Sequence, residues 1–456
     1  MLMPGVTLIM SRPMIATALL VCDIAALMCA RDVLEDPWNL LVSDEAWREA
    51  VLYGLWWVVA GLTTLFVYVL DERTPDGRLP RWRHTKLTLS SMAAIAPVVA
   101  LSVMVVPNIR AMRDVFVQAP VATPTIDGVS LLPGARVTPG ADQKHGRVNI
   151  LLLGGDAGPR RWGLRTDAMH VVSVDLDTQE AAVISIPRNL GRAPMPPGLS
   201  RQFPKGFTNI ANAVYGWGAQ HPAEVAAALG ATEEPGATLT AAMISELTGL
   251  RIDAWVVVDM QGFLDIVDAF GGVDVWVKQF LKTPGNVPGG KHPLRDFTPG
   301  WHHMDGTDAL GYSRARKSDS DYHRMTRQRC VLASLAAQTD AAELAWRWGS
   351  IADVLSKSVR TNLTPELLNS LKGLVGADVS YTRVLSLNPP LVPTYNWDAA
   401  DVRAVVAEVI DGKLRTPLVL PRETGAPNLT TATTVPAPVG ASSAGDEVQD
   451  QCRTKP

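Results

Sequence analysis

The sequence predicts an α/β layer fold for the chain beyond residue 146, because short apolar runs alternate with longer helical segments. The apolar runs have the length of buried strands, and several of them are bounded by Gly or Asp. We expect strands at Val148–Leu153, 168–175, 181–186, Trp255–Val258 and Val273–Val277, and helices at 237–250, 260–270 and Arg324–Ala337.

The first strand carries the clearest signal for a site. Val148–Leu153 is apolar apart from Asn149, and it is followed directly by Gly-Gly and then Asp156. Glycines at a strand end let the backbone come close to a ligand. The next two strands are separated by Asp177-Thr178-Gln179, which predicts a hairpin.

The helix at 260–270 has good boundary residues. Asp259 is a suitable N-cap, and Gly271 is a suitable stop just beyond the last turn. Since strands Trp255–Val258 and Val273–Val277 flank this helix, we expect the three elements to form one β-α-β unit. In the helix Arg324–Ala337, the residues expected on the buried side are Val331, Leu332 and Leu335.

The chain of 456 residues is 47% hydrophobic and only 19% charged, and the excess of apolar residues lies at its N-terminus. Residues 1–106 are expected to contain three transmembrane helices, at about 14–30, 50–70 and 87–106. A cleaved signal peptide is the alternative for the first span, which is interrupted by Asp23. Beyond them we expect a linker or entry region at 107–146, the catalytic domain at 147–340, its C-terminal completion at 341–420 and a disordered tail at 421–456.

Loop charge predicts the orientation in the membrane. Five cations between the second and third spans favour the cytoplasm: Arg73, Arg78, Arg81, Arg83 and Lys86. This arrangement places the N-terminus in the cytoplasm and the domain outside, in a multi-pass protein of the cell membrane. Cys330 and Cys452 would then lie where disulfides form, but the sequence leaves their pairing open. The net charge of -3 gives no indication of nucleic acid binding.

Two carboxylates and a set of arginines suggest the chemistry. Asp156 and Asp167 are eleven residues apart near predicted strand ends, and paired carboxylates hold hard divalent cations. Guanidinium groups hold phosphate oxygens in two-pronged contacts. One candidate is Arg188, which follows Ile-Pro. Arg314 and Arg316 would share one face of a strand, and Arg324, Arg327 and Gln328 would share one face of a helix. The alternatives are turn-forming aspartates and a solvated basic face.

Several ordered blocks resemble the LytR-CpsA-Psr family over about residues 147–340. The blocks read NILLLGGD, LRTDAMHVVSVDLDTQEAAVISIPRN, NIANAVYGWG, IDAWVVVDMQGFLDIVDAFGGVDV and MDGTDALGYSRARKSDSDYHRMTRQRCVL. The resemblance implies an LCP-type domain, in which a mixed central sheet is flanked by helices. It also implies a membrane tether with the domain outside, which agrees with the orientation that loop charge predicts.

Members of this family transfer a glycopolymer from a polyprenyl-pyrophosphate carrier to peptidoglycan through a phosphodiester link. By this resemblance, Asp156 and Asp167 hold Mg²⁺, and Arg165, Arg188 and Asp167 are catalytic. The residues implied for binding pyrophosphate are Arg165, Arg188, Arg314, Arg316, Arg324, Arg327 and Gln328. The implied partners are a polyprenyl-pyrophosphate-linked glycan and a peptidoglycan acceptor.

One position departs from the family pattern. Asn189 stands where the family usually has Asp after Pro-Arg, and an amide can neither act as a base nor carry charge. The general base is therefore left open among Asp156, Asp167 and a water. Two alternative functions also stay open: a polyprenyl-pyrophosphate phosphatase, and a non-catalytic, membrane-tethered lipid-binding protein.

Overall fold

The computed structural model describes the central part of the chain. The described residues are 125–126, 129–130, 146–156, 165–315, 321–339, 351, 353–364, 367, 371, 382–389, 391–412, 446–447 and 452. The chain divides into two units, Met1–Asp114 with Pro365–Lys372, and Val115–Thr364 with Gly373–Pro456. All the helices and strands named below belong to the second unit.

The three predicted transmembrane helices, within residues 1–106, lie outside the described residues. In the part of the chain that the structure describes, no helix combines the length and the apolar character needed to cross a bilayer.

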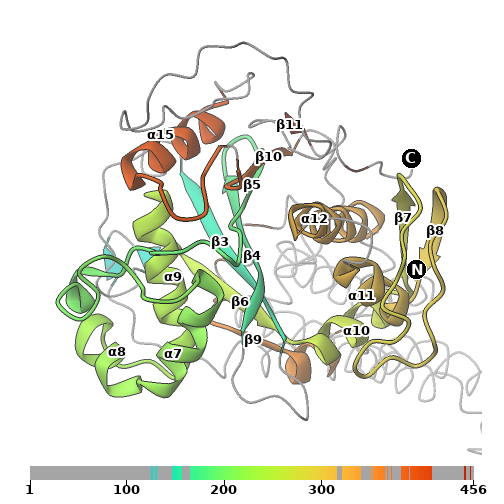
Figure 1. Ribbon diagram of the computed structural model, residues 1–456, viewed down its shortest axis with the longest axis horizontal. Coiled ribbons are helices and arrows are strands. Elements are labelled where there is room, and N and C mark those ends of the chain that lie inside the picture. The colour runs from blue at the N-terminus through green and yellow to red at the C-terminus, as the bar shows by residue number, and fades with distance from the viewer. Residues whose placement is uncertain are drawn as a thin grey trace, which may run out of the picture. The chain divides into compact units, whose positions relative to one another are not determined.

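A mixed seven-stranded sheet forms the centre of the second unit, in the order β11-β10-β5-β4-β3-β6-β9 (Figure 1). Its strands are β3 (Arg147–Gly155), β4 (Thr166–Asp175), β5 (Ala181–Ser185), β6 (Ala254–Val258), β9 (Val359–Thr361), β10 (Arg383–Ser386) and β11 (Asp446–Glu447). β3 runs antiparallel to β4 and parallel to β6, while β5 runs parallel to β10. The mixed α/β architecture predicted from the sequence is confirmed.

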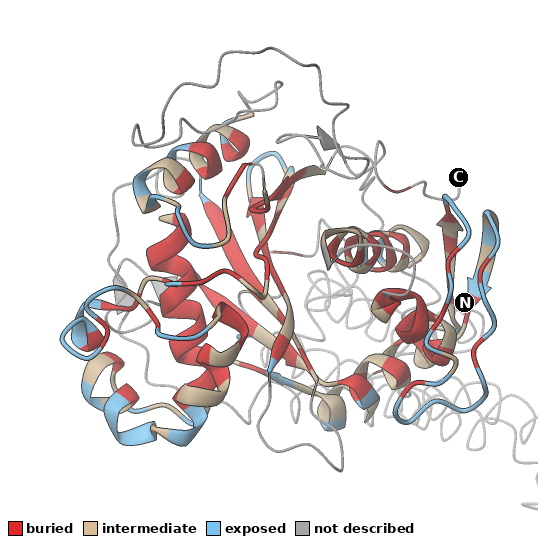
Figure 2. Cartoon of the chain, in the orientation of Figure 1, coloured by how far each residue is buried: buried red, intermediate tan, exposed pale blue. Residues whose placement is uncertain are grey.

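Helices cover both faces of this sheet (Figure 1). On one side lie α7 (Val214–Gln220), α8 (Pro222–Leu229), α9 (Pro235–Thr248) and α15 (Ala399–Ile410); on the other lie α10 (Met260–Ala269), α11 (Gly306–Arg314) and α12 (Asp321–Gln338). The largest hydrophobic core lies on the α9 side, and α9 is buried along almost its whole length (Figure 2). The other side contains a cavity, described below.

Smaller elements surround this framework. The short 3₁₀ helices η2 (Pro197–Leu199) and η3 (Ala211–Ala213) lie in the connection from β5 to α7. The strands β1 (Thr125–Ile126) and β2 (Val129–Ser130) pair with each other, as do β7 (Val273–Val277) and β8 (Gly300–Met304).

Most local predictions are confirmed. The first three strands form β3, β4 and β5, and β4 and β5 pair as the expected hairpin. The side chain of Asp259 caps α10 by accepting a hydrogen bond from the backbone N–H of Gly262 at 2.8 Å. Gly271 follows α10 with a φ of +85°, a left-handed conformation that favours glycine.

The predicted β-α-β unit is wrong. β6 lies in the central sheet between β3 and β9, whereas β7 pairs with β8 in a separate two-stranded sheet. After α10 the chain reverses through Gly271 and Gly272, both with positive φ, and the sheet position next to β6 is taken by β9. Periodicity identified the strands but carries no information on which edge each one joins.

The strand expected at Arg314 is also wrong. Arg314 is the last residue of α11, which begins at the N-cap Asp305. The Asp305 side chain accepts a hydrogen bond from the backbone N–H of Asp308 at 2.9 Å. Arg316 lies outside the described residues.

Two places in the predicted disordered tail need correction. β11 pairs antiparallel with β10, and Cys452 forms a disulfide bond with Cys330 of α12. The side chains of Cys330, Cys452 and Val384 pack in one small apolar cluster. An edge strand of the sheet and a cross-link therefore hold residues 446–447 and 452, which the local composition does not reveal.

Candidate active site

A cavity of about 400 Å³ lies between the sheet and helices α10, α11 and α12. Residues of β3, β4, β6 and β9 form its floor, and most of the lining is apolar. The charged lining residues gather where β3 and β6 end and β4 begins: Asp156, Asp167, Asp259, Arg314 and Arg324. The cavity thus combines a charged region with a mostly apolar lining.

Asp167 is the most extensively bonded of these residues. Its Oδ1 accepts hydrogen bonds from Nη1 of Arg188 at 2.9 Å and from Nδ2 of Asn212 at 3.2 Å. Arg324 donates to its backbone carbonyl at 3.3 Å. Burial alone raises the pKa of Asp167, but the hydrogen bond and charge of Arg188, with the charge of Arg324, outweigh it and lower the pKa. Asp167 is therefore an anion held in a fixed orientation at neutral pH.

Arg188 and Asn212 reach Asp167 from the connection between β5 and α7. Ile186 extends the pairing beyond β5, since its N–H donates to the carbonyl of Met169 at 2.9 Å. The backbone N–H of Asn212 then donates to the carbonyl of Arg188 at 3.1 Å. These bonds place both side chains beside the start of β4.

Asp156 and Arg165 close the base of the connection between β3 and β4. The backbone N–H of Asp156 donates to the carbonyl of Arg165 at 2.9 Å, and the backbone N–H of Arg165 donates to Oδ1 of Asp156 at 3.0 Å. Arg165 is exposed and lies outside the cavity lining. A Cβ on Gly154 would lie 2.9 Å from Cβ of Ala168, so glycine is required where the two strands approach.

One face of helix α12 lines the cavity and changes from polar to apolar along the helix. Arg324, Gln328, Leu332 and Leu335 all line it, and this spacing keeps them on one face of a helix. Arg324 and Gln328 come first along the helix, and the two leucines follow. This stripe therefore runs from the charged region into the apolar lining. Of the three residues predicted on the buried side of this helix, Val331 is fully buried and Leu335 is half-buried, whereas Leu332 is 36% exposed, so the prediction is wrong for Leu332.

The structure separates the predicted arginines. Arg314 lines the cavity, and its Nη1 contacts Sδ of Met260. Arg327 does not line the cavity: it is buried and donates to the backbone carbonyls of Tyr312 and Ala315, near the end of α11. Cationic side chains commonly satisfy carbonyl groups at helix ends. Arg327 therefore stabilises the end of α11, whereas Arg314 and Arg324 line the cavity.

Sequence reasoning missed His170, which lines the cavity while only 2% exposed. Its Nδ1 lies 2.9 Å from Oγ of Ser185, which also accepts a hydrogen bond from Arg329 at 2.9 Å. Burial and the charge of Arg329 lower the pKa of His170 to about 3, so the ring is neutral. A lone histidine in an apolar strand gave no signal of this position.

The donor set at the cavity fits Mg²⁺ only with help from a ligand. Mg²⁺ is usually held by one or two carboxylates together with substrate phosphates and water. Asp156 and Asp167 both line the cavity and supply two carboxylates. Within the described ranges, they belong to no group of three protein ligands that could hold an ion by itself.

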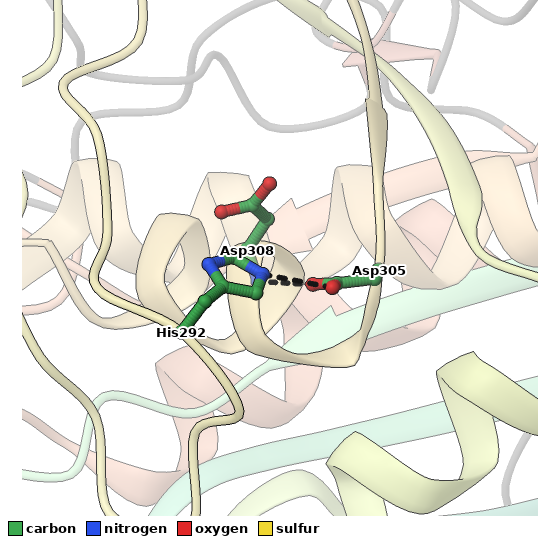
Figure 3. Close-up of side chains that lie close together, drawn as sticks. All are labelled: His292, Asp305 and Asp308. Carbon is green, nitrogen blue, oxygen red and sulfur yellow. Dashed lines mark hydrogen bonds and ion pairs between the residues drawn. The ribbon is translucent and has the colours of Figure 1, made fainter.

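The described residues do contain one such group elsewhere, formed by His292, Asp305 and Asp308 (Figure 3). Nε2 of His292 lies 2.8 Å from Oδ2 of Asp305, and Nδ1 lies 3.1 Å from the carbonyl of Pro293. Asp305 also caps α11. The cluster therefore links the loop that carries His292 to the start of α11, and these hydrogen bonds explain why the three side chains lie together.

The model of the LytR_cpsA_psr family matches residues 127–387 of the chain. Among curated proteins, the teichoic acid transferase TagU of Bacillus mycoides is 29% identical over 221 residues, which is 48% of this chain and 61% of that protein. Its full name is polyisoprenyl-teichoic acid–peptidoglycan teichoic acid transferase. The biofilm regulatory protein A of Streptococcus mutans is 27% identical over 233 residues, covering 49% of this chain and 51% of that protein. The chain thus spans between half and two thirds of the length of these relatives.

Two solved structures are also similar. B. subtilis TagV has 24% sequence identity and a TM-score of 0.43, covering 59% of this chain and 96% of that one. B. subtilis TagT has 23% identity and a TM-score of 0.40, covering 63% of this chain and 98% of that one.

Proposed function

The chain belongs to the LytR-CpsA-Psr family, and on this premise we propose that it transfers a glycopolymer from a polyprenyl-pyrophosphate carrier to a peptidoglycan hydroxyl. The observation that carries the proposal is the two-part cavity, in which Asp167, Arg314 and Arg324 line a charged region and most of the remaining lining is apolar. A lipid pyrophosphate has the same two parts, an anionic head and an apolar tail. The similar TagU bears the name of such a transferase.

In the proposed reaction the acceptor hydroxyl oxygen bonds to the phosphorus that carries the glycan. The bond from this phosphorus to the bridging oxygen breaks, and its electron pair leaves with polyprenyl monophosphate. The hydroxyl proton passes to a base, for which Asp156, Asp167 and a water are the candidates. The product is a phosphodiester, and no nucleotide is needed because the pyrophosphate bond is cleaved in the same step.

The residues of the cavity supply positioning and charge, the main requirements of phosphoryl transfer. Arg188 and Asn212 fix Asp167 through its Oδ1, and Arg324 lies against the same residue. We propose that Asp156 and Asp167 hold Mg²⁺ together with pyrophosphate oxygens. When bound, the ion neutralises charge on the phosphates. The guanidinium groups of Arg314 and Arg324 are then placed to bind the remaining oxygens.

We further propose that Arg165 contacts the glycan-bearing phosphate. It is exposed, and its backbone N–H donates to the side chain of Asp156. Arg316 follows Arg314 by two residues, and we extend the same phosphate-binding role to it on the family resemblance.

The membrane location is part of the proposal. A lipid carrier requires access to a bilayer, which the three spans predicted in residues 1–106 would provide. The disulfide between Cys330 and Cys452 supports a domain outside the cytoplasm, because such bonds persist in oxidising compartments.

The test uses the full-length protein in detergent with a synthetic polyprenyl-pyrophosphate disaccharide, Mg²⁺ and soluble peptidoglycan fragments. Mass spectrometry should detect a phosphodiester-linked product that disappears with EDTA. Asp167→Ala should abolish the product, and Arg188→Ala should lower its rate of formation by roughly 100- to 1,000-fold. The exposed-site controls Arg295→Ala and Asp353→Ala, which lie outside the cavity lining, should retain it.

Other outcomes would replace the proposal. Release of phosphorylated sugar in place of linked product identifies a phosphatase. Lipid binding without turnover, in a folded wild-type protein, identifies a non-catalytic lipid-binding protein and implicates Asn189 in the loss of activity.

A further inference from the structure

We propose that a second cavity, here called the basic groove, binds the glycan of the peptidoglycan acceptor. The groove has a volume of about 400 Å³, and its lining includes Arg192, Lys205, Thr208, Asn209 and Tyr395. The inference rests on the proposed transfer reaction, because it identifies where the second substrate of that reaction lies. Four observations carry it: position, a fixed aromatic ring, charge and available polar groups.

The groove is joined to the candidate active site by two backbone segments. Residues 188–193 and 207–212 run side by side, through the bridge between Gly191 and Ile210 and the hydrogen bond from Phe207 N–H to the Ala193 carbonyl at 2.8 Å. One end of this pair carries Arg188 and Asn212, which contact Asp167. Arg192, four residues beyond Arg188, lines the groove, so their Cα atoms are at most about 14 Å apart. This span suits a short oligosaccharide that reaches from the groove to the phosphate.

Tyr395 provides an aromatic surface that is both exposed and fixed. Its side chain belongs to a residue that is 56% exposed. The segment that carries it is held by the Gly191 N–H donating to the Thr394 carbonyl at 2.9 Å, and by Nε1 of Trp397 donating to the Gly191 carbonyl at 3.0 Å. A Cβ on residue 191 would lie 2.2 Å from the Tyr395 ring, so the ring packs directly on the glycine backbone.

An exposed aromatic ring that packs on the backbone on one side is well suited to bind a sugar. The C–H face of a pyranose packs on an aromatic face, and the tyrosine hydroxyl at the rim adds a polar contact. Because the packing on Gly191 fixes the ring before a ligand arrives, little conformational entropy is lost on binding.

The charge of the groove selects among glycans. Arg192 and Lys205 are both exposed cations, and none of the described residues in the lining is acidic. Arg192 has a φ of +55°, a backbone conformation that a residue with a side chain rarely adopts and that often occurs at functional sites. Peptidoglycan fragments carry free carboxylates on the stem peptide, which cations recognise. Asn209 is exposed, and its Oδ1 accepts a hydrogen bond from the Ile210 N–H, so the amide N–H groups are the donors that it can offer to a sugar.

The experiment measures binding and turnover separately, with the full-length protein in detergent. Soluble disaccharide-peptide fragments of peptidoglycan are titrated and followed by isothermal calorimetry. Tyr395→Ala and Arg192→Gln should each weaken fragment binding by at least tenfold, whereas Tyr395→Phe, which keeps the ring, should bind within threefold of wild type. Phe280→Ala is the matched control, because Phe280 is 54% exposed and lies outside the groove. Thermal melts confirm that each variant is folded.

In the transfer assay, the same two variants should raise KM for the acceptor at least tenfold and leave KM for the lipid donor unchanged. An unchanged acceptor KM in both variants overturns the groove assignment while leaving the transfer reaction intact. A raised donor KM alone also overturns it, because the groove would then hold the donor glycan. If the two variants lose binding to vesicles of anionic phospholipid but bind the fragments as wild type does, the groove binds the membrane surface and not the acceptor.

The two proposals fail in distinguishable ways. If wild type gives no transfer but the fragments bind in a manner that depends on Tyr395 and Arg192, the groove assignment stands and the proposed function fails.

Discussion

The hydrogen bond between Arg188 and Asp167 is the residue-level contact on which the candidate active site depends most. Arg188 fixes the orientation of the carboxylate at 2.9 Å and lowers its pKa. The sequence predicted both residues as part of the site, and the structure brings them together. The sequence could not predict Asn212 as the second donor to the same oxygen, because Asn212 lies 45 residues from Asp167, in a 3₁₀ turn.

Replacing Arg188 by Ala should lower kcat for glycan transfer by roughly 100- to 1,000-fold, the cost usually seen when one preorganised donor is lost. Since Arg188 lowers the pKa of Asp167 in the wild type, that pKa should rise in the variant. The acidic limb of the pH–rate profile should therefore move to higher pH. A profile of kcat against pH checks this, and a drop in kcat without movement of the acidic limb would contradict it.

His170 predicts a pH dependence of stability. Its pKa is lowered from 6.5 to about 3 by burial, so the unfolded chain binds a proton that the folded protein excludes. Stability should therefore be greatest above about pH 6.5 and fall as the pH drops toward 3, by up to about 1.4 kcal/mol per pH unit. Urea unfolding between pH 7 and about pH 5.5 measures the slope, because ordinary carboxylates are mostly ionised in that range.

His170→Met should flatten this slope, whereas the control His303→Gln, at an exposed position, should leave it unchanged. A slope that is the same in wild type and in His170→Met would show that the buried ring is not its source.

At the scale of elements, α12 connects the charged and apolar parts of the cavity through Arg324, Gln328, Leu332 and Leu335. Helical spacing in the sequence predicted that Arg324 and Gln328 share one face, because residues three or four apart share one side of a helix. The same rule gave the wrong location for Arg327, whose guanidinium turns to the end of α11. The β-α-β prediction failed for a related reason, since local pattern does not specify which edge of a sheet a strand joins.

Leu332 tests the role of the apolar stripe. It is 36% exposed, lies against the cavity and can be changed at little cost to the core. Leu332→Asp should weaken binding of long-chain polyprenyl pyrophosphates by roughly tenfold or more, since a charge in an apolar pocket is costly. A geranyl pyrophosphate, whose tail is short, should bind within about threefold of wild type if the head contacts dominate its affinity.

Ala336→Asp is the matched control, because it puts the same charge on an exposed position of the same helix. Fluorescence or calorimetric titration with both lipids checks the prediction. Equal losses for long and short chains would place the lipid tail elsewhere.

On the scale of the whole molecule, the Cys330–Cys452 disulfide joins α12, which lines the cavity, to a residue 122 positions later. The sequence predicted an α/β fold and a membrane tether, and the fold is confirmed for the described residues. It left the cysteine pairing open, because cysteine count and compartment do not fix which residues meet. Composition alone assigned residue 452 to a disordered tail, and only the tertiary contact corrects this.

Cys452→Ser should lower the free energy of unfolding by about 2–4 kcal/mol, because the cross-link closes a long loop and restricts the unfolded chain. Guanidinium unfolding of wild type and variant measures the difference. A reducing agent should bring wild type to the stability of the variant and leave the variant unchanged. Equal stability of the two proteins under oxidising conditions would mean that the bond does not form in solution.

The central claim is that the pyrophosphate of a lipid carrier becomes a phosphodiester to peptidoglycan. ³¹P NMR of the reaction in detergent follows this conversion directly. We expect the pyrophosphate signals to be replaced by one phosphodiester and one phosphomonoester in equal amounts, and only when the peptidoglycan acceptor is present. Two phosphomonoesters formed without an acceptor, or pyrophosphate signals that persist with active protein and Mg²⁺, would contradict it.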